Sequence, residues 1–583
     1  MNFPQEKKTG AWLRSQNMKW VAILSPIESE IDRDPSRLKR VLLSVSVILG
    51  LIPAIAGYSY GGDTVSYLDM GDAFFAGHWE AIFNGLWSPL YPFLLGLTRW
   101  MLKPSMRWEP LVMQLTNFLI FMTTVLAFQF FWDEVLRFYR QMSKQEGSMG
   151  LATFGDGEFW VLGYVIFLSL YLPLLNAATP DMLLSTIVYL AAGLMLRIRQ
   201  GGPTLGRFCL FGLLLALGFL TKAVMLPLAG VFLVTAALCT ARQRFGITYS
   251  LIAALVFAGI AGPYVFGLSK TEGHFTLGKS PNLNYAWHVN GAPFIHWQGE
   301  LAGLGKPEHP TRKIFSSPQV YEFGSPVSAT YAPWYDPSYW NEGLRARFDW
   351  AEQVSALEKS LHEYFGEFKS QAVLIVGVLL LLAMRAVGRT ALREYLTVWY
   401  LWVPALAAFT IYGLVWVEDR YVAQFFVLFW GTVLTLVRLP EGRDSRRLIR
   451  TVTAIVVALV SIQVAPYYLR DAVHGHREAA WQMHIAEGLA DRGVRAGEKV
   501  AVLDAGLGDA WQKLLRVSVV AEIPYEEDNK FWAADQSRKT QIYEALAKTG
   551  ANFLITTQIP EWASTRGWEK IEGTPAYVFY LDR

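Results

Sequence analysis

The chain has 583 residues, and its 52 Lys and Arg residues against 49 Asp and Glu residues leave a net charge of only +3. This balance excludes a protein that binds nucleic acid mainly by electrostatic attraction. Charged residues make up only 17% of the chain and hydrophobic residues 53%, which excludes a disordered chain and indicates that much of it avoids water. With only two cysteines, a disulfide framework and a cysteine-ligated zinc site are excluded as well.

Apolar stretches without charged residues recur along the chain and predict about eleven membrane helices. They lie at 41–59, 111–132, 159–176, 182–196, 208–221, 223–239, 247–268, 371–384, 396–416, 421–437 and 451–469. Most approach the roughly 20 residues that a helix needs to cross the hydrocarbon layer. A bilayer accepts only segments that satisfy their own backbone hydrogen bonds, and these runs are too long for barrel strands. The sequence therefore predicts a polytopic α-helical membrane protein.

Lys and Arg residues are unevenly shared among the connections between these runs. The segment before the first run and every second connection after it are basic, for example around Arg137 and Arg197. The alternate short connections carry almost no basic residues, and Lys222 and Arg420 are the exceptions. Because short basic loops stay on the inner side, we expect a cytoplasmic N-terminus in the cytoplasmic (inner) membrane and an extracytoplasmic C-terminal portion.

One further apolar stretch, at 87–102, would break this alternation if it crossed the membrane. We interpret it as an amphipathic or re-entrant piece on the outer surface, within a first outer loop at about 60–110. The first apolar run contains an Ala-Ile-Ala sequence at 54–56 that resembles a signal-peptidase site. An uncleaved anchor is favoured, because the charged segment before it is far longer than the basic start of a signal peptide.

The pattern divides the chain into five regions. They are a cytoplasmic segment (1–40), a first membrane module with seven helices (41–268), a large outer loop (269–370), four further membrane helices (371–470) and an extracytoplasmic portion (471–583). In the last region, apolar runs at 499–505, 517–523, 552–557 and 577–582 surround a helical stretch at 541–550. This alternation predicts a small α/β domain. The outer loop is rich in Pro and aromatic residues and ends in a stretch with apolar residues at helical spacing, from Leu344 to Phe365.

Ionisable residues avoid the middle of the apolar runs and gather at their outward ends. They are Asp63, Asp69, Asp72, Asp181, Lys222, Glu418, Asp419 and Arg420. Transporters commonly carry ionisable residues inside spanning helices, so this distribution disfavours a transporter. Acids and bases at one membrane face indicate chemistry on a substrate with a polar head and a lipid tail.

Segments at these positions resemble the GT-C superfamily of glycosyltransferases that use polyprenyl-phosphate sugars, particularly the protein O-mannosyltransferase and aminoarabinose-transferase-like branch. The segments are GGDTVSYLDMGDAFFAGHW with WSPLYPFLLGL, then TPDMLL, GFLTK and EDRY. The resemblance covers the first 270 residues best and lies in the order and outward location of the pieces. It implies a bundle that transfers a sugar from a lipid phosphate to an acceptor at its outer face. It also implies that Asp63 is the catalytic base and that Lys222 and Arg420 hold the donor phosphate.

General chemistry agrees with these roles. A carboxylate can remove the proton of an acceptor hydroxyl, and Asp63 and Asp181 are the candidates. Lys and Arg at a partly dehydrated rim can stabilise the departing phosphate. The expected partners are therefore a polyprenyl-phosphate sugar, a glycan, lipid or protein acceptor, and the bilayer. A single displacement would invert the configuration at the sugar carbon.

Each of these residues also has a plainer interpretation. Asp63 could cap a helix that begins at Thr64, and Asp181 could be an ordinary acid in a first helical turn. Lys222 could be an interfacial turn lysine, and Arg420 could pair with Glu418 or Asp419. Asp181 could alternatively bind the donor, the acceptor or, with Asp63, a divalent metal.

Other features carry weaker expectations. Tyr67 and His78 could line the site, while Asp69 and Asp72 are interpreted as solvated surface charges. The aromatic residues of the outer loop could stack on sugar rings, but an interfacial belt is favoured, with the loop still covering the site. VLDAGLGDAW at 502–511 lacks the third glycine of a dinucleotide-binding pattern, so the C-terminal domain is interpreted as an accessory or acceptor-recognition module. The alternatives to an enzyme are a lipid or polysaccharide transporter and a non-catalytic envelope-assembly protein.

Overall fold

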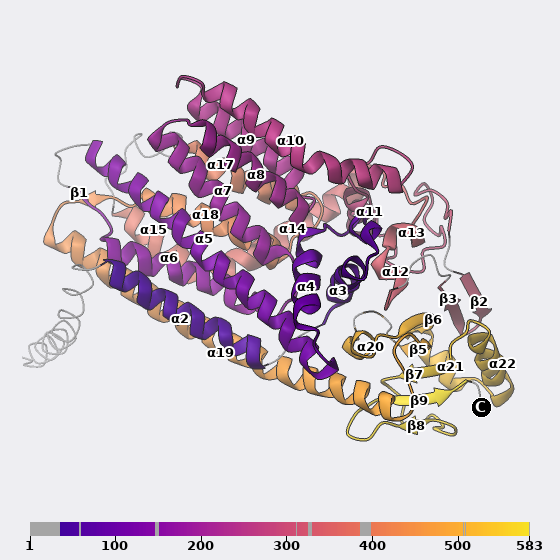
Figure 1. Cartoon of the computed structure of the whole chain (residues 1–583). Helices are drawn as coiled ribbons and strands as arrows, with labels where there is room; N and C mark the ends of the chain where they lie inside the picture. The colour runs from indigo at the N-terminus through magenta and orange to yellow at the C-terminus, as the bar shows by residue number, and fades with distance from the viewer. Residues whose placement is uncertain are drawn as a thin grey trace, which may run out of the picture.

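The computed structural model describes residues 35–56, 60–145, 151–309, 312–323, 329–384, 398–504, 507 and 509–581. A long helical bundle carries an outer region with a mixed sheet at one end (Figure 1). Most of the predicted N-terminal segment and the basic connection at 385–397 lie outside the described residues.

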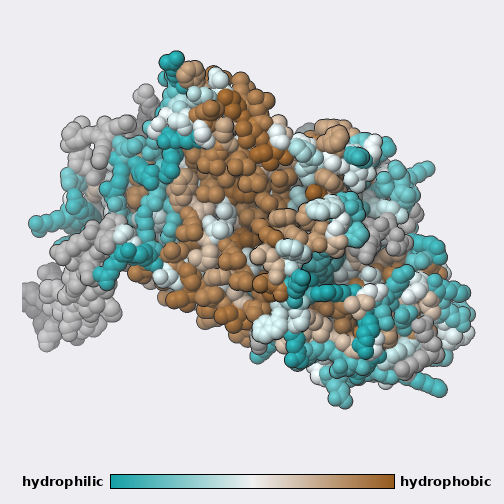
Figure 2. All heavy atoms as spheres, in the orientation of Figure 1, coloured by the Kyte–Doolittle hydropathy of each residue, from teal (hydrophilic) through white to brown (hydrophobic). Residues whose placement is uncertain are grey.

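Each of the predicted apolar runs falls on a helix. These helices are α2 (Pro35–Ala56), α5 (Glu109–Gln145), α6 (Asp156–Tyr171), α7 (Asp181–Gly201), α8 (Leu205–Thr221), α9 (Met225–Thr240), α10 (Gly246–Thr271), α15 (Ala372–Ala383), α17 (Trp399–Gly413), α18 (Asp419–Thr435) and α19 (Arg443–Asp491). Figure 2 shows a broad hydrophobic band between two hydrophilic ends of this bundle. The expected polytopic helical membrane protein is therefore confirmed.

The expected number of membrane spans is not confirmed. Within the described residues, six helices are long and apolar enough to cross a membrane. The number rises to seven if α14 (Trp350–Ser370) and α15, which meet at a bend of 72°, form one broken span. Helices α8 and α9 are apolar but shorter. The chain is a multi-pass membrane protein, and the length of a charge-free run does not by itself set the length of the helix that forms there.

The first outer loop folds into two short helices that cross closely. They are α3 (Gly62–Phe75) and α4 (Leu90–Leu102), with a turn of 3-10 helix, η1 (Trp79–Ile82), between them. A Cβ atom on Gly71 would lie 2.5 Å from the carbonyl oxygen of Pro92, and one on Gly96 would lie 2.6 Å from that of Gly71. Only glycine allows this approach. The stretch interpreted as a re-entrant or surface piece is thus α4, a helix of 13 residues packed against α3 and α5.

The outer regions share one seven-stranded sheet with the order β2-β3-β6-β5-β7-β9-β8. The four predicted runs of the C-terminal region form β5 (Lys499–Asp504), β6 (Ser518–Pro524), β7 (Phe553–Thr556) and β9 (Tyr577–Tyr580), and β8 (Glu569–Lys570) lies at the edge. β5 is parallel to both β6 and β7, while α22 (Gln536–Ala547) contains most of the predicted helical stretch. The expected small α/β fold is confirmed.

Two strands of this sheet come from the large outer loop. They are β2 (Arg312–Ser316) and β3 (Gln319–Glu322), and β3 pairs antiparallel with β6. Helix α19 also runs without a break from the membrane bundle into the outer region, through the boundary expected at residue 470 (Figure 1). The loop and the C-terminal portion, which were treated as separate regions from the sequence, are therefore joined by hydrogen bonds into one outer unit.

The aromatic residues of the outer loop mostly form the core of this unit. Trp287, Trp297, Tyr331, Tyr335 and Trp340 are all buried. The interfacial belt favoured from the sequence is therefore wrong for these residues. They pack on one another and on the first outer loop because a large loop outside the membrane needs its own apolar core.

Candidate functional site

Four charged residues from distant parts of the chain meet at one end of the bundle. Asp63 lies in the first turn of α3, Asp181 is the first residue of α7, Lys222 follows α8, and Arg420 lies in the first turn of α18. The Nζ atom of Lys222 donates to Oδ1 of Asp181 at 2.5 Å. Arg420 reaches both acids, with Nη2 3.8 Å from Oδ2 of Asp63 and Nε 4.0 Å from Oδ2 of Asp181.

The N-terminal end of α3 is tied to the segment that leads into α7. The hydroxyl of Thr64 donates to the carbonyl oxygen of Ala178 at 3.3 Å and is buried. This contact brings Asp63 next to Asp181. The N-cap of α3 is Gly61, and Asp63 is the second residue of the helix, so the interpretation of Asp63 as the helix cap is wrong.

Arg420 and Lys222 are held by a second set of contacts. Nε of Arg420 donates to Oε2 of Glu418 at 2.5 Å, as the plainer interpretation of Arg420 expected, and the indole of Trp416 donates to the other oxygen of Glu418 at 3.0 Å. Nζ of Lys222 lies 3.5 Å from the centre of the Tyr421 ring, a cation–π contact. Lys222 is thus a half-buried member of a charge cluster and not a snorkelling turn residue.

Both parts of the outer unit reach the Asp63 end of the cluster. The indole of Trp334, in α12 (Ala332–Tyr335), donates to Oδ1 of Asp63 at 3.0 Å. From the C-terminal region, Leu507 lies so close to Gly62 that a Cβ atom there would be 2.4 Å from Cδ1 of Leu507. Asp63 therefore sits where the membrane bundle and the outer unit meet.

Burial shifts the pKa values of Asp63 and Lys222 in opposite directions, so that the two values move closer together. It raises the pKa of Asp63 above its ordinary value, while Arg420 and the hydrogen bond from Trp334 oppose the shift. Burial also lowers the pKa of Lys222, against the attraction of Asp181. A carboxylate with a raised pKa is a stronger base than an ordinary surface aspartate, which suits proton removal near neutral pH.

Comparison with known proteins addresses the fold. No protein-family profile matches this sequence, and no curated protein matches it. Among solved structures, ArnT from Cupriavidus metallidurans in the apo state is similar, with a TM-score of 0.52 and 14% identity over 92% of this chain and 96% of that chain. The same protein bound to undecaprenyl phosphate gives a TM-score of 0.52 and 13% identity over the same shares. The chain has the GT-C fold. An oligosaccharyltransferase from Archaeoglobus fulgidus, in complex with Zn and sulfate, is similar with a TM-score of 0.45 and 11% identity over 88% of this chain and 67% of that chain.

One of the two further candidate residues lies beside the charge cluster. Tyr67 is buried one turn after Asp63 and meets Trp87 and Tyr91 edge to face, with ring centres 5.2 Å and 5.3 Å apart. Its pKa is raised well above the ordinary value by burial, then by the charges of Asp63 and Asp181. Tyr67 is therefore a neutral, buried side chain that packs next to the charge cluster.

His78 lies apart from the charge cluster. Its side chain is 70% exposed before η1, and its Nδ1 atom lies 3.5 Å from Oε1 of Glu80. The structure does not bring His78 to the cluster, because His78 follows the last residue of α3, Phe75, whereas Asp63 lies in the first turn of that helix.

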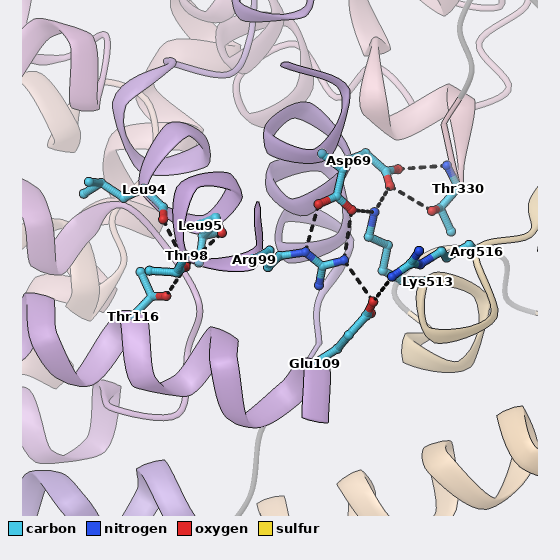
Figure 3. A network of polar contacts seen from close by, with 11 residues as sticks. Asp69, Leu94, Leu95, Thr98, Arg99, Glu109, Thr116, Thr330, Lys513 and Arg516 are labelled. Carbon is cyan, nitrogen blue, oxygen red and sulfur yellow. Dashed lines mark hydrogen bonds and ion pairs between the residues drawn. The ribbon is translucent and has the colours of Figure 1, made fainter. Parts of the chain in front are cut away.

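The expectation of solvated charges at Asp69 and Asp72 is also wrong. Nζ of Lys513, in α20 (Ala510–Leu515), donates to Asp69 at 2.6 Å and to Asp72 at 2.8 Å (Figure 3). Asp69 also accepts hydrogen bonds from the backbone and hydroxyl of Thr330 at 2.8 Å and 2.9 Å. Arg99 donates two hydrogen bonds to the carboxylate of Asp72, at 2.8 Å and 2.9 Å. One carboxylate pair on α3 therefore joins both parts of the outer unit.

The same network of ion pairs extends to Glu109, the first residue of α5. Oε1 of Glu109 lies 3.2 Å from Arg99 and accepts from Arg516 at 2.6 Å, so three acids and three bases are combined (Figure 3). Although burial alone would raise the pKa of Asp72, the charges of Lys513 and Arg99 hold it at about 2. The network fixes the helix that carries Asp63 against the C-terminal region.

Substitution of Lys513 by Met is expected to destabilise the protein by about 3–5 kcal/mol, since it leaves the buried carboxylate of Asp69 and the half-buried carboxylate of Asp72 without their shared cation. The matched control is Lys548→Met, because Lys548 is an exposed lysine of the same region, where a substitution away from the core changes stability by about 0.5 kcal/mol or less. Thermal unfolding in detergent measures both. Equal midpoints for the two variants would contradict the role given to the network.

The donor set of the cluster does not fit a dedicated metal ion. Within the described residues, no group of three or more His, Cys, Asp or Glu side chains converges. Asp63 and Asp181, the two carboxylates considered for a metal, both face the guanidinium of Arg420, and Asp181 also holds Lys222. Two cations already neutralise these acids, and a Ca²⁺ or Mg²⁺ ion takes more oxygen ligands than two carboxylates supply.

Proposed function

We propose that the chain transfers a sugar from a polyprenyl-phosphate-linked donor to an acceptor at the outer face of the cytoplasmic membrane. The observation that carries the proposal is the meeting of Asp63, Asp181, Lys222 and Arg420 at one end of a GT-C bundle. The similar ArnT binds undecaprenyl phosphate, which supports a polyprenyl phosphate as the carrier here. The acceptor is a glycan, a lipid or a protein.

In the proposed reaction, Asp63 takes the proton of an acceptor hydroxyl as its oxygen attacks the anomeric carbon of the sugar. The bond from that carbon to the phosphate oxygen breaks, and its electrons leave with the polyprenyl phosphate. The raised pKa of Asp63 favours this proton transfer. A single displacement of this kind inverts the configuration at the sugar carbon.

Lys222 and Arg420 are proposed to bind the donor phosphate. An incoming phosphate would raise the pKa of Lys222, because a nearby anion favours the charged ammonium. Asp181 is buried, and its Oδ2 atom accepts no hydrogen bond within the described part of the chain. We propose that Asp181 orients the ammonium of Lys222, and that the N–H groups of Arg420 that do not bind Glu418 donate to phosphate oxygens.

The proposed orientation follows from the basic connections. We place the N-terminus in the cytoplasm and the outer unit on the extracytoplasmic side, where nucleotide sugars are scarce and a lipid-linked donor is needed. We further propose that the C-terminal region serves acceptor recognition, since Leu507 and Trp334 both lie beside Asp63.

Deletion of the gene tests the proposal in the cell. We expect one polyprenyl-phosphate sugar to accumulate and the corresponding envelope glycan to lack that sugar, as measured by mass spectrometry of lipid and envelope fractions. The accumulated lipid would name the donor. Unchanged lipid-linked sugars and unchanged glycans would contradict the proposed function.

Substitution of Trp334 by Phe is expected to shift the acid limb of the pH–rate profile to higher pH. The hydrogen bond from the indole lowers the pKa of Asp63, and Phe keeps a ring but removes the donor. The pKa of Asp63 then rises, so a smaller fraction of the base is ionised at a given acidic pH. The profile of Trp562→Phe, at an exposed site in the outer unit, serves as the control. Superimposable acid limbs would refute the assignment of Asp63.

A further inference from the structure

Helix α14 lies where the large outer loop enters the second group of membrane helices. Asp349 caps its start by accepting hydrogen bonds from the backbone N–H groups of Ala351 and Glu352 at 2.9 Å and 3.1 Å. The helix runs from Trp350 to Ser370 and then meets the apolar helix α15 at a bend of 72°. It therefore does not follow the direction of the membrane helix that succeeds it.

One stripe of α14 packs on the protein and consists of polar or small side chains. Gln353, Ala356 and Ser360 are buried. The amide of Gln353 donates to the carbonyl oxygen of Leu414 at 2.9 Å and accepts from the hydroxyl of Tyr285 at 2.7 Å. These contacts fix which side of the helix faces the protein.

Four large apolar side chains of α14 point away from the protein, while Tyr364 and Phe368 pack on it. Trp350, Val354, Leu361 and Phe365 follow one another at intervals of four, seven and four residues, which places them in one stripe of a helix. Their exposed fractions are 74%, 56%, 68% and 67%. A surface helix of a water-soluble protein normally buries this stripe against the core, so the arrangement is inverted.

The remaining side of α14 is polar and charged. It carries Ser355, Glu358, Lys359, His362 and Lys369, all of which are exposed. The helix thus has three faces: one toward the protein, one apolar and exposed, and one polar and exposed. A helix that lies flat at a membrane surface needs such an apolar face beside a polar one.

We propose that α14 lies in the plane of the bilayer interface, with its apolar stripe inserted about 5–10 Å into the boundary between headgroups and acyl chains. The next helix, α15, belongs to the membrane bundle and also exposes apolar side chains, among them Val376 and Leu379. The bend between the two helices lets one lie along the interface while the other enters the hydrocarbon.

The charged residues of α14 indicate that the helix is held at the membrane by its apolar side chains and not by electrostatic attraction to lipid headgroups. The helix carries Glu352, Glu358, Glu363 and Glu367 against Lys359 and Lys369. An excess of acids gives no electrostatic attraction to anionic lipids, which basic interfacial helices use. The insertion therefore depends on buried apolar area and needs no anionic lipid.

The contacts of α14 with α17 also affect the position of Arg420, and this part of the inference rests on the proposed function. Besides the Gln353 contact at Leu414, the hydroxyl of Tyr364 donates to the carbonyl oxygen of Phe409 at 2.6 Å. Both acceptors lie near the end of α17, shortly before Glu418 and Arg420. An interfacial α14 holds Arg420 near the level at which a lipid phosphate reaches the protein.

Site-directed spin labelling of the full chain tests the interfacial position without any sugar donor. Cys209 and Cys239 are the only cysteines, and Cys209→Ala with Cys239→Ala supplies the background. Single cysteines replace Val354, Leu361 or Phe365 in the apolar stripe, with Ser355→Cys and His362→Cys as matched controls on the polar face. All five positions are exposed, so a label fits without repacking. The proteins are placed in nanodiscs of phosphatidylcholine, with and without phosphatidylglycerol.

The expected result is greater collision with oxygen and less with a water-soluble nickel complex at the three apolar positions than at the two controls. The difference should be the same in both lipid compositions. Labels that collide with nickel equally at all five positions would overturn the proposal. Apolar positions shielded from both reagents would also overturn it, because a second copy or another protein would then cover the stripe. Neither outcome depends on whether the chain transfers a sugar.

Discussion

Substitution of Asp63 by Asn is expected to reduce sugar transfer by about 10²–10⁴-fold, the usual contribution of a general base. Asn has nearly the same shape as Asp, and its carbonyl oxygen can still accept the hydrogen bond that Trp334 donates at 3.0 Å. The variant should therefore fold, while the group that accepts the proton is lost. The measurement is the rate of sugar transfer by the purified variant from lipids extracted from the deletion strain.

The control for this substitution is Glu80→Gln, which makes the same chemical change in the same outer loop. Glu80 is exposed and pairs only loosely with His78, at 3.5 Å. Its variant should transfer at the wild-type rate with the wild-type unfolding temperature. If Asp63→Asn retained full activity, Asp63 would not be the base, and Asp181 would become the remaining candidate at the cluster.

Substitution of Arg420 by Gln is expected to lower the maximal transfer rate by about 10²–10³-fold, as the removal of one strong electrostatic donor to a developing anion does. Arg420 lies within 3.8–4.0 Å of both central carboxylates and is the cation best placed to meet a phosphate with two N–H groups. Because the charge on the leaving phosphate grows in the transition state, the maximal rate should fall more than the apparent donor affinity.

Arg107→Gln is the matched control for Arg420, since Arg107 is 75% exposed in the outer region and pairs with Glu487. If Arg420→Gln bound the donor more weakly but kept the maximal rate, Arg420 would contact the lipid phosphate equally in the ground state and in the transition state. That result would contradict its role in stabilising the leaving group.

The membrane helices and the location of the cluster could be predicted from the sequence. A long run of apolar residues without charges predicts a membrane helix whatever its partners are, and the described part of each such run falls on a helix. The alternation of basic connections predicts that α7 and α18 begin and α8 ends at the same face of the bundle, and Asp181, Lys222 and Arg420 do meet there. The GT-C resemblance drawn from these segments agrees with the fold.

The partners supplied by the outer unit could not be predicted. Trp334 reaches Asp63 across 271 positions of sequence, and nothing distinguishes it from the neighbouring aromatic residues that are buried in the core. Asp69 and Asp72 looked like surface charges because their partner Lys513 lies more than 440 positions away. Such pairs follow from how β3 joins β6 and how α20 meets α3, which depends on tertiary packing.

The central claim is tested most directly by turnover with purified protein in nanodiscs. The substrate is the polyprenyl-phosphate sugar that accumulates in the deletion strain, and the acceptor is the envelope fraction of that strain. The account predicts that the wild-type protein releases polyprenyl phosphate in step with sugar gained by the acceptor, and that Asp63→Asn releases almost none. A lipid-linked sugar that stays intact with the wild-type protein, while the acceptor remains unmodified, would contradict the account.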